Sequence, residues 1–468
     1  MAKTKEVDLT HGSIFKKLFL FAVPFIFTNI LQILFNAADI AVVGIFVNDD
    51  AVAAVGANTA LITLLTGFFV GLSIGANVVL SRYAGKRDRE AAMRTVGTSI
   101  MVALVAGIAL MLIGVLFTRE FITLMNCDPR IMDQAETYLK IYFFGIPIML
   151  VYNFAASLLR AAGDTKRPLI YLCISGVVNV ALNVFFVVVC KMTVEGVAIA
   201  TISSWSISAV LCLIALFRSK EYASLRLKYL RFFKIQLKEV LLIGIPSGLQ
   251  SVAFSISNVL IQSTINSYGA TAMSANTTAA QFDGIIYNIG NAISMSCMSF
   301  IGQNVGARKM FRVKKVIFCS IILILMLQLS VGLLFTLLAP VLCSIIVSGE
   351  DVIALACQRL SILCPLYFMC GIMEILGNAC RAMGKPIVSF IISVMGATVF
   401  RIIFMELTLM IWPGFATIYW SYPASWIFTI AMYLCFTPSV YKKLKARIEK
   451  TDEQNKVQEN TEELQMEG

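Results

Sequence analysis

Charged residues and histidine are scarce in this sequence. Only 14% of its 468 positions are Asp, Glu, Lys or Arg, whereas soluble domains carry about 25%. The single histidine, His11, lies outside the apolar runs, and most of the twelve cysteines lie singly inside them. No nucleophile–histidine pair can form within a membrane span, and no G-x-x-x-x-G-K-[ST] sequence is present to bind nucleotide phosphates. We therefore expect neither an enzyme, nor an ATP-driven pump, nor a metal or cofactor site.

Apolar residues, in contrast, make up 59% of the chain. They form long runs, and a run of about 20 apolar residues crosses the roughly 30 Å hydrocarbon core of a bilayer as a helix. Helices are required because lipid cannot satisfy free backbone N–H and C=O groups. The sequence predicts an all-α membrane protein with twelve transmembrane helices, at residues 14–36, 52–80, 95–118, 136–157, 168–190, 195–217, 239–265, 270–300, 314–340, 352–374, 386–410 and 414–437.

Basic residues are concentrated in the N-terminal tail, in alternate loops and after residue 441, whereas the other loops are acidic or neutral. Because cytoplasmic loops carry an excess of Lys and Arg, this pattern places both termini in the cytoplasm. The expected location is therefore the cell inner (plasma) membrane, with many passes through the lipid bilayer. The net charge of +11 follows from this loop asymmetry and does not indicate a nucleic-acid partner.

The sequence also contains an internal repeat. Residues 160–163 (Arg-Ala-Ala-Gly) recur as residues 381–384 (Arg-Ala-Met-Gly), and Pro24 falls within one residue of the same 221-residue offset from Pro246. Six spans per half is an even number, so both halves insert in the same orientation, as a parallel repeat around a central cavity. The expected parts are an N-terminal cytoplasmic tail (1–13), a six-helix bundle (14–217), a cytoplasmic connector (218–238), a second six-helix bundle (239–437) and a cytoplasmic tail with a disordered end (438–468).

Several motifs resemble those of the multidrug and toxic compound extrusion (MATE) transporters over about residues 11–440. They are Pro24 followed by residues 39–44 (Asp-Ile-Ala-Val-Val-Gly), residues 53–56 (Ala-Ala-Val-Gly), residues 302–307 (Gly-Gln-Asn-Val-Gly-Ala) and the two Arg-Ala-x-Gly turns. The pattern is more similar to the bacterial DinF-like branch. This resemblance implies export of small organic cations by alternating access, driven by a proton or sodium gradient. We expect the transporter to be a monomer.

Intramembrane carboxylates are functional candidates, because each costs roughly 2.5–3.5 kcal/mol at the bilayer centre on insertion scales. Asp39, near the outer end of the first span with Asn36 beside it, matches the coupling aspartate that the resemblance implies. It could instead cap the outer loop. Related proteins often carry an aspartate where this chain has Asn183, one turn after Asn179. Asn183 cannot release a proton, but it can hydrogen-bond Asp39 or a bound ion.

A candidate for a helix kink lies on the first span, and a further candidate for coupling lies on the tenth. Pro24 is expected to kink the first helix by leaving a backbone carbonyl unpaired, or to serve only in packing. Glu374, about two turns from the cytoplasmic end of the tenth span, is a second coupling candidate because the NorM-like branch uses acidic residues there. The alternative for Glu374 is a structural ion pair with Arg401 or Arg381.

The candidates for the substrate cavity are polar residues within other spans. Asp283 could attract a cationic substrate, with Tyr287 on the next turn. Asn258 and Gln262 belong to a polar stripe that faces the cavity or joins helices, and Asn153 is the repeat equivalent of Glu374. Arg401 is the one basic residue that we place clearly within a span, against four carboxylates, which favours a cationic substrate. The alternatives are a flippase for lipid-linked glycans, which would need several basic residues in the cavity, and a non-transporting channel or scaffold.

Overall fold

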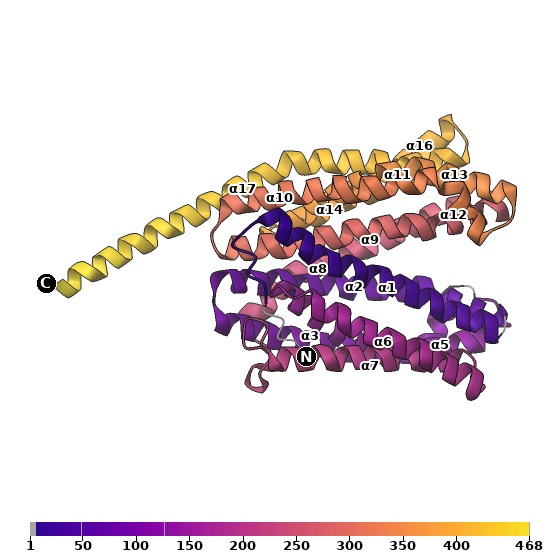
Figure 1. Cartoon of the computed structure of the whole chain (residues 1–468), viewed down its shortest axis with the longest axis horizontal. Coiled ribbons are helices and arrows are strands. Elements are labelled where there is room, and N and C mark those ends of the chain that lie inside the picture. Colours follow the sequence, from indigo (N-terminus) through magenta and orange to yellow (C-terminus); the bar gives the residue numbers. More distant parts are fainter. Residues whose placement is uncertain (1–5, 48, 126, 468) are drawn as a thin grey trace.

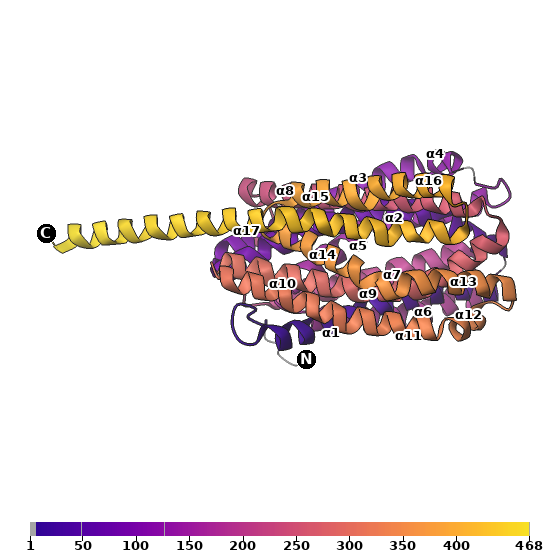
Figure 2. The ribbon, with the colours of Figure 1, turned by 90° about the horizontal axis from the view of Figure 1, so that it is seen from above.

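The computed structural model describes residues 6–47, 49–125 and 127–467, and these residues form helices and no strands. Twelve of the helices in this part of the chain are long and apolar enough to cross a membrane. They lie side by side in one elongated bundle, and α17 extends beyond one end of it (Figures 1 and 2). The predicted all-α fold with twelve spans is confirmed.

The first six spans and the short helix α4 occupy residues 14–218. Their bounds are α1 (Ile14–Phe46), α2 (Asp49–Lys86), α3 (Arg89–Leu116), α4 (Thr118–Leu124), α5 (Met132–Ala161), α6 (Lys166–Val184) with the π-helical turn η1 (Phe185–Val189), and α7 (Val194–Arg218). The connector to the next span contains one 3₁₀ turn, η2 (Leu227–Tyr229).

The second set of spans uses shorter helical pieces. Its elements are α8 (Lys234–Asn266), α9 (Ala270–Gly306), α10 (Met310–Ile324), η3 (Leu325–Leu329), α11 (Ser330–Leu337), α12 (Ala339–Ile346), α13 (Glu350–Leu363), η4 (Cys364–Leu366), α14 (Tyr367–Ala382), α15 (Pro386–Val394), η5 (Met395–Phe400), α16 (Arg401–Ile411) and α17 (Phe415–Glu467). α17 continues as one helix through the segment for which the sequence predicts disorder.

The backbone repeats itself at positions related by the predicted offset of 221 residues. Arg87 and Arg308 have φ angles of 60° and 59°, in the left-handed region that non-glycine residues rarely adopt. Gly163 and Gly384 have φ angles of 103° and 89° in the two Arg-Ala-x-Gly turns. The short helices α4 and α12 also begin at equivalent positions. The repeated sequence motifs therefore mark repeated turns.

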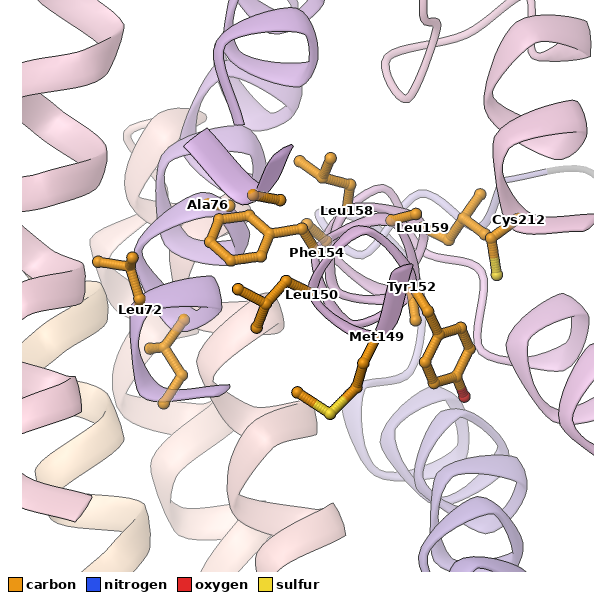
Figure 3. Close-up of a cluster of buried hydrophobic side chains, with 14 of the residues drawn as sticks. Leu72, Ala76, Met149, Leu150, Tyr152, Phe154, Leu158, Leu159 and Cys212 are labelled. Carbon is orange, nitrogen blue, oxygen red and sulfur yellow. The ribbon is translucent and has the colours of Figure 1, made fainter. Parts of the chain in front are cut away.

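Helix α5 forms the centre of the first half. Figure 3 shows its apolar side chains pointing in several directions, towards Leu72 and Ala76 of α2 on one side and Cys212 of α7 on the other. Phe154, Leu158 and the other α5 residues of this cluster are almost fully buried. A helix that is apolar around its whole circumference is expected to be buried on all sides. The position of α5 places its polar residues at the wall of the internal cavity described below.

The two halves touch closely at the end of the bundle where α1 and α8 begin and α2 and α9 end, which we call the inner end. A Cβ atom added at Gly75 of α2 would lie 2.2 Å from the Val240 carbonyl oxygen, and one at Gly85 would lie 1.9 Å from the Gln303 carbonyl oxygen. Such backbone contact requires glycine. The opposite end of the bundle is called the outer end.

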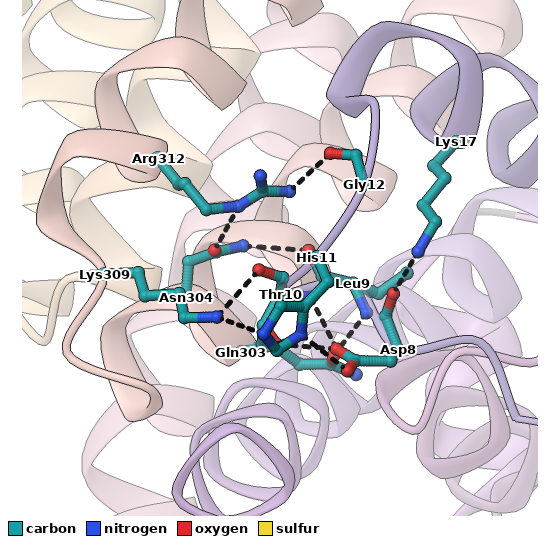
Figure 4. Close-up of polar contacts among 10 residues, drawn as sticks. All are labelled: Asp8, Leu9, Thr10, His11, Gly12, Lys17, Gln303, Asn304, Lys309 and Arg312. Carbon is teal, nitrogen blue, oxygen red and sulfur yellow. Dashed lines mark hydrogen bonds and ion pairs between the residues drawn. The ribbon is translucent and has the colours of Figure 1, made fainter.

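Residues 6–12, here called the N-terminal strap, bind across both halves at the inner end (Figure 4). Leu9 is fully buried; its N–H donates to Gln303 Oε1 (3.1 Å) and its carbonyl accepts from Asn304 Nδ2 (3.2 Å). On the side of the first half, the Val7 N–H donates to the Gly163 carbonyl (3.4 Å). The Gly-Gln-Asn motif at the end of α9 therefore holds the strap in place.

Glu6 is expected to make docking of the strap depend on pH. Its carboxylate accepts hydrogen bonds from Ser219 Oγ (2.8 Å) and the Tyr222 N–H (3.2 Å), but burial raises the pKa of Glu6 to about 7, and the charge of Glu221 acts in the same direction. The docked strap then holds its proton more tightly than a free strap would. Docking is therefore strongest below the ordinary glutamate pKa of about 4.3 and is weakened as the pH rises through 7.

We expect the protection factor of the Leu9 amide against hydrogen exchange to fall about tenfold between pH 6 and pH 8. The variant Glu6→Gln, which cannot ionise, should show the same protection at both pH values. An equal pH dependence in both proteins would mean that another group controls docking.

Candidate transport cavity

A cavity of about 560 Å³ lies within the first half and is bordered on one side by α9 of the second half. Its wall is formed by α1, α2, α5, α6 and α7, together with one face of α9. Among the described residues that line it, one is acidic, Asp39, and one is basic, Arg160. The other polar lining residues are neutral amides and hydroxyls, including Asn29, Gln32, Asn36, Thr59, Thr63, Thr66, Ser73, Asn77, Asn153, Ser157, Asn179, Thr201, Asn288 and Asn291.

Asp39 lies on α1 and is partly buried among donors from two neighbouring helices. Asn183 Nδ2 of α6 donates to Asp39 Oδ1 (2.5 Å), and Thr201 Oγ1 of α7 donates to Asp39 Oδ2 (3.3 Å). The predicted contact between Asp39 and Asn183 is therefore present. Thr201 was not predicted as a partner, because α7 offers several similar hydroxyl groups.

The amide of Asn183 leaves one oxygen beside this carboxylate without a donor. Its Nδ2 also donates to Asn179 Oδ1 (3.4 Å), while Asn183 Oδ1 is buried without a hydrogen-bond partner among the described residues. A buried acceptor without a donor is unfavourable. Carboxylate, amide and hydroxyl oxygens are also the ligands that hard cations prefer. The group can therefore hold either a proton on Asp39 or a small cation between these oxygens.

Aromatic and sulfur-containing side chains form much of the remaining wall. Tyr142 and Trp205 meet edge to face, with ring centroids 5.1 Å apart. The rings of Tyr138 and Tyr152 and the side chain of Met149 line the same cavity, all from α5. Such faces attract organic cations and flat apolar rings, and methionine adapts to different shapes.

One face of α9 closes the cavity from the second half. Asn29 Nδ2 of α1 donates to the Asn288 carbonyl (3.3 Å) and to Asn291 Oδ1 (3.5 Å). Tyr287, a predicted cavity residue, lies on the same face and also lines the cavity, as does Asn153 of α5. Amide contacts between α1 and α9 therefore join the halves beside the cavity.

Comparison with known proteins identifies the family. The family model described as MatE matches the chain twice, at residues 24–185 and 246–406. The chain belongs to the MatE family. Members of this family are multidrug efflux transporters and not enzymes, and the resemblance predicted from the motifs is confirmed.

Similar MatE proteins match over most of their length. The probable multidrug resistance proteins YoeA and YpnP of Bacillus subtilis (strain 168) are 26% and 27% identical to this chain. The alignments cover 82% and 86% of this chain, and 84% and 90% of those proteins. The fold is also that of a solved MATE transporter of the MOP superfamily in an outward-facing conformation. That structure has a TM-score of 0.88 and 20% identity, and the match covers 95% of this chain and all of that one.

Asp283, predicted as a cavity residue, lies elsewhere in this MatE chain. It is buried in α9, and its Oδ2 accepts from Nε and Nη2 of Arg359 (2.9 and 2.6 Å), which lies on α13. The prediction that Arg401 is the one basic residue clearly within a span is therefore wrong. Arg359 lies within its own predicted span, and its distance from both ends of that span was the signal that could have identified it.

The polar stripe and Glu374 also lie outside the residues that line the cavity. Gln262 donates to Asn266 Oδ1 and accepts from Asn276 of α9 (both 2.8 Å), so this part of the stripe joins α8 to α9. Asn258 is exposed. Glu374 is partly buried in α14 and, among the described residues, forms no ion pair.

Pro24 and Arg401 have neighbours that the sequence did not indicate. Pro24 lies inside the continuous helix α1, where Thr28 Oγ1 donates to its carbonyl (2.8 Å). Arg401 donates to Ser425 Oγ (2.9 Å) and lies over the ring of Tyr422 (4.5 Å to the centroid). Its contacts therefore involve α17 and not Glu374.

Proposed function

We propose that this chain exports aromatic organic cations by exchange with protons or sodium ions, and that Asp39 is the coupling carboxylate. The observation that supports this proposal most directly is the position of Asp39. It is the one acidic group among the described lining residues of a cavity with aromatic walls. The organic cation would compete with a proton or a sodium ion for this one negative charge. Such competition is the basic requirement for exchange.

The neighbours of Asp39 support a role in ion exchange more than a role as a helix cap. Asn183 and Thr201 come from two other helices, so the state of the carboxylate is sensed by α1, α6 and α7 together. Loss of its charge on protonation, or its neutralisation by sodium, would change both hydrogen bonds. Alternating access would then follow from a rearrangement of these helices around the cavity.

The remaining parts of the proposal concern the setting of the protein. The inner end, which carries the basic loops, faces the cytoplasm, and the bundle lies in the plasma membrane as a monomer. A flippase for lipid-linked glycans is the weaker candidate, because one basic residue, and not several, lines the cavity among the described residues.

Ethidium uptake by reconstituted vesicles tests this proposal. Vesicles loaded with acid or with sodium ions, and diluted into medium of higher pH or without sodium, should accumulate ethidium several-fold above vesicles without protein. Dependence on one loaded ion and not on the other identifies the coupling ion. Uptake that only equilibrates ethidium, whatever ion is loaded, would favour a channel and contradict the proposal.

A further inference from the structure

Arg160 places the only positive charge among the described lining residues at one end of the cavity. It is in the last turn of α5, partly buried, with its guanidinium 4.5 Å from the ring centroid of Phe25 of α1. Asp39 lies fourteen residues further along α1, which corresponds to about 21 Å of helix. The two charges therefore lie at opposite ends of the cavity and do not neutralise each other directly.

The internal repeat supplies a comparison for this arginine. Arg381 is equivalent to Arg160 and is buried, with Nη1 donating to Asn378 Oδ1 (2.5 Å) and Nη2 donating to Gln250 Oε1 (2.6 Å). Two amide oxygens thus satisfy the guanidinium of the second half. This arrangement is what a purely structural arginine at this turn requires.

The first half lacks both amides. Asn378 corresponds to Ser157 at the offset of 221, and Gln250 corresponds to Thr28 at the offset of 222 that pairs Pro24 with Pro246. The hydroxyl groups of Ser157 and Thr28 donate to the backbone carbonyls of Ser73 (3.0 Å) and Pro24 (2.8 Å). Among the described residues, the Arg160 side chain forms no hydrogen bond or ion pair, and its guanidinium lies over the Phe25 ring. The first half therefore lacks the amides that hold the guanidinium of the second half, while its own guanidinium lies at the cavity.

A guanidinium in this setting is suited to bind an oxyanion. It has five N–H donors, and two of them match the two oxygens of a carboxylate. Partial removal from water makes an unpaired charge unfavourable, and a ring contact compensates only part of this cost. A ligand carboxylate would satisfy the donors, and the Phe25 face would lie against an aromatic ring attached to it.

We propose that the inner end of the cavity is a subsite for the carboxylate of zwitterionic or anionic aromatic substrates, with Arg160 as the group that binds it. The substrates would then include molecules that carry a carboxylate, in addition to the cations that Asp39 attracts. This inference rests on the proposed export function for its biological meaning, but binding to Arg160 can be measured without transport.

The test compares two dyes that differ in one group. Rhodamine 110 has a free carboxylate, and rhodamine 123 is its methyl ester with the same ring system. Binding of each dye to the purified full-length protein is followed by fluorescence anisotropy at neutral pH. We expect Arg160→Gln to weaken binding of rhodamine 110 at least tenfold and to change binding of rhodamine 123 less than about twofold. Arg160→Lys keeps the charge but not the paired donors, so its affinity for rhodamine 110 should lie between those of the unaltered protein and Arg160→Gln.

Arg381→Gln is the matched control, because it removes the equivalent arginine outside the cavity. It should leave the ratio of the two dissociation constants as in the unaltered protein, even if it lowers stability. The proposal is overturned if the unaltered protein does not bind rhodamine 110, or if Arg160→Gln leaves that ratio unchanged. Failure of the export function has a different signature, since vesicles would then show no gradient-driven uptake of rhodamine 123 whatever the binding ratio.

Discussion

Replacing Asp39 with asparagine is expected to abolish gradient-driven ethidium uptake, to the level of vesicles without protein. The amide is nearly the same size and can still bond Asn183 and Thr201, so the fold and the cavity should persist. It cannot release a proton, and it lacks the charge that would bind sodium. If Asp39 couples ethidium uptake to the driving proton or sodium ion, the initial rate of uptake should fall about a hundredfold or more. This corresponds to roughly 2.7 kcal/mol of activation free energy.

The control for this variant is Asp50→Asn, which removes an exposed negative charge near the same outer end without touching the cavity. It should retain most of the uptake rate. Ethidium binding to the Asp39→Asn protein should be measured in parallel, because weaker binding alone would be corrected by more dye. Unchanged gradient-driven uptake in Asp39→Asn would show that Asp39 is not the coupling carboxylate.

The spans could be predicted because each is a long apolar run, and the turns because both halves repeat them. Arg87 and Arg308 follow their runs at the same offset, and the structure places both in the same unusual backbone conformation. The N-terminal strap could not be predicted in this way. Leu9 bonds to residues almost three hundred positions away in the sequence, and no periodic pattern predicts such a contact.

Only some of the residues that line the cavity could be predicted from the sequence. Hydropathy identifies which polar residues lie within spans but not which way they point. Asn153 and Tyr287 point into the cavity, whereas Gln262 points to a neighbouring helix. From the sequence, Arg160 serves only to mark the repeat. Among the described residues its guanidinium has no hydrogen-bond partner, and the comparison with Arg381, which has two, makes this difference apparent.

A second buried polar cluster lies where α9, α13 and α17 meet. It is formed by Asp283 and Asn276 of α9, Arg359 of α13 and Tyr419 of α17. Arg359 also donates to the Asn276 carbonyl (3.4 Å), and the Tyr419 hydroxyl donates to Asn276 Oδ1 (3.0 Å). All four side chains are buried. The ion pair joins α9 to α13, so its charges are satisfied by each other and not by a substrate.

Asp283→Ala is therefore expected to be among the most destabilising single substitutions in the second half. It leaves the Arg359 guanidinium buried without its anion, which typically costs about 3–5 kcal/mol. The double variant Asp283→Leu with Arg359→Met removes both charges and fills similar volume, so it should recover most of that loss. Thermal and denaturant unfolding of the purified proteins measure both effects.

The same double variant separates a structural role of Asp283 from a role in transport. Because the pair lies outside the residues that line the cavity, ethidium uptake by the double variant should remain within about twofold of the unaltered protein once the amount of folded protein is matched. A stable double variant that has lost gradient-driven uptake would instead show that the charge of Asp283 takes part in transport. Retention of uptake would exclude a requirement for the charge of Asp283 and leave the coupling role to other carboxylates, of which Asp39 lines the cavity.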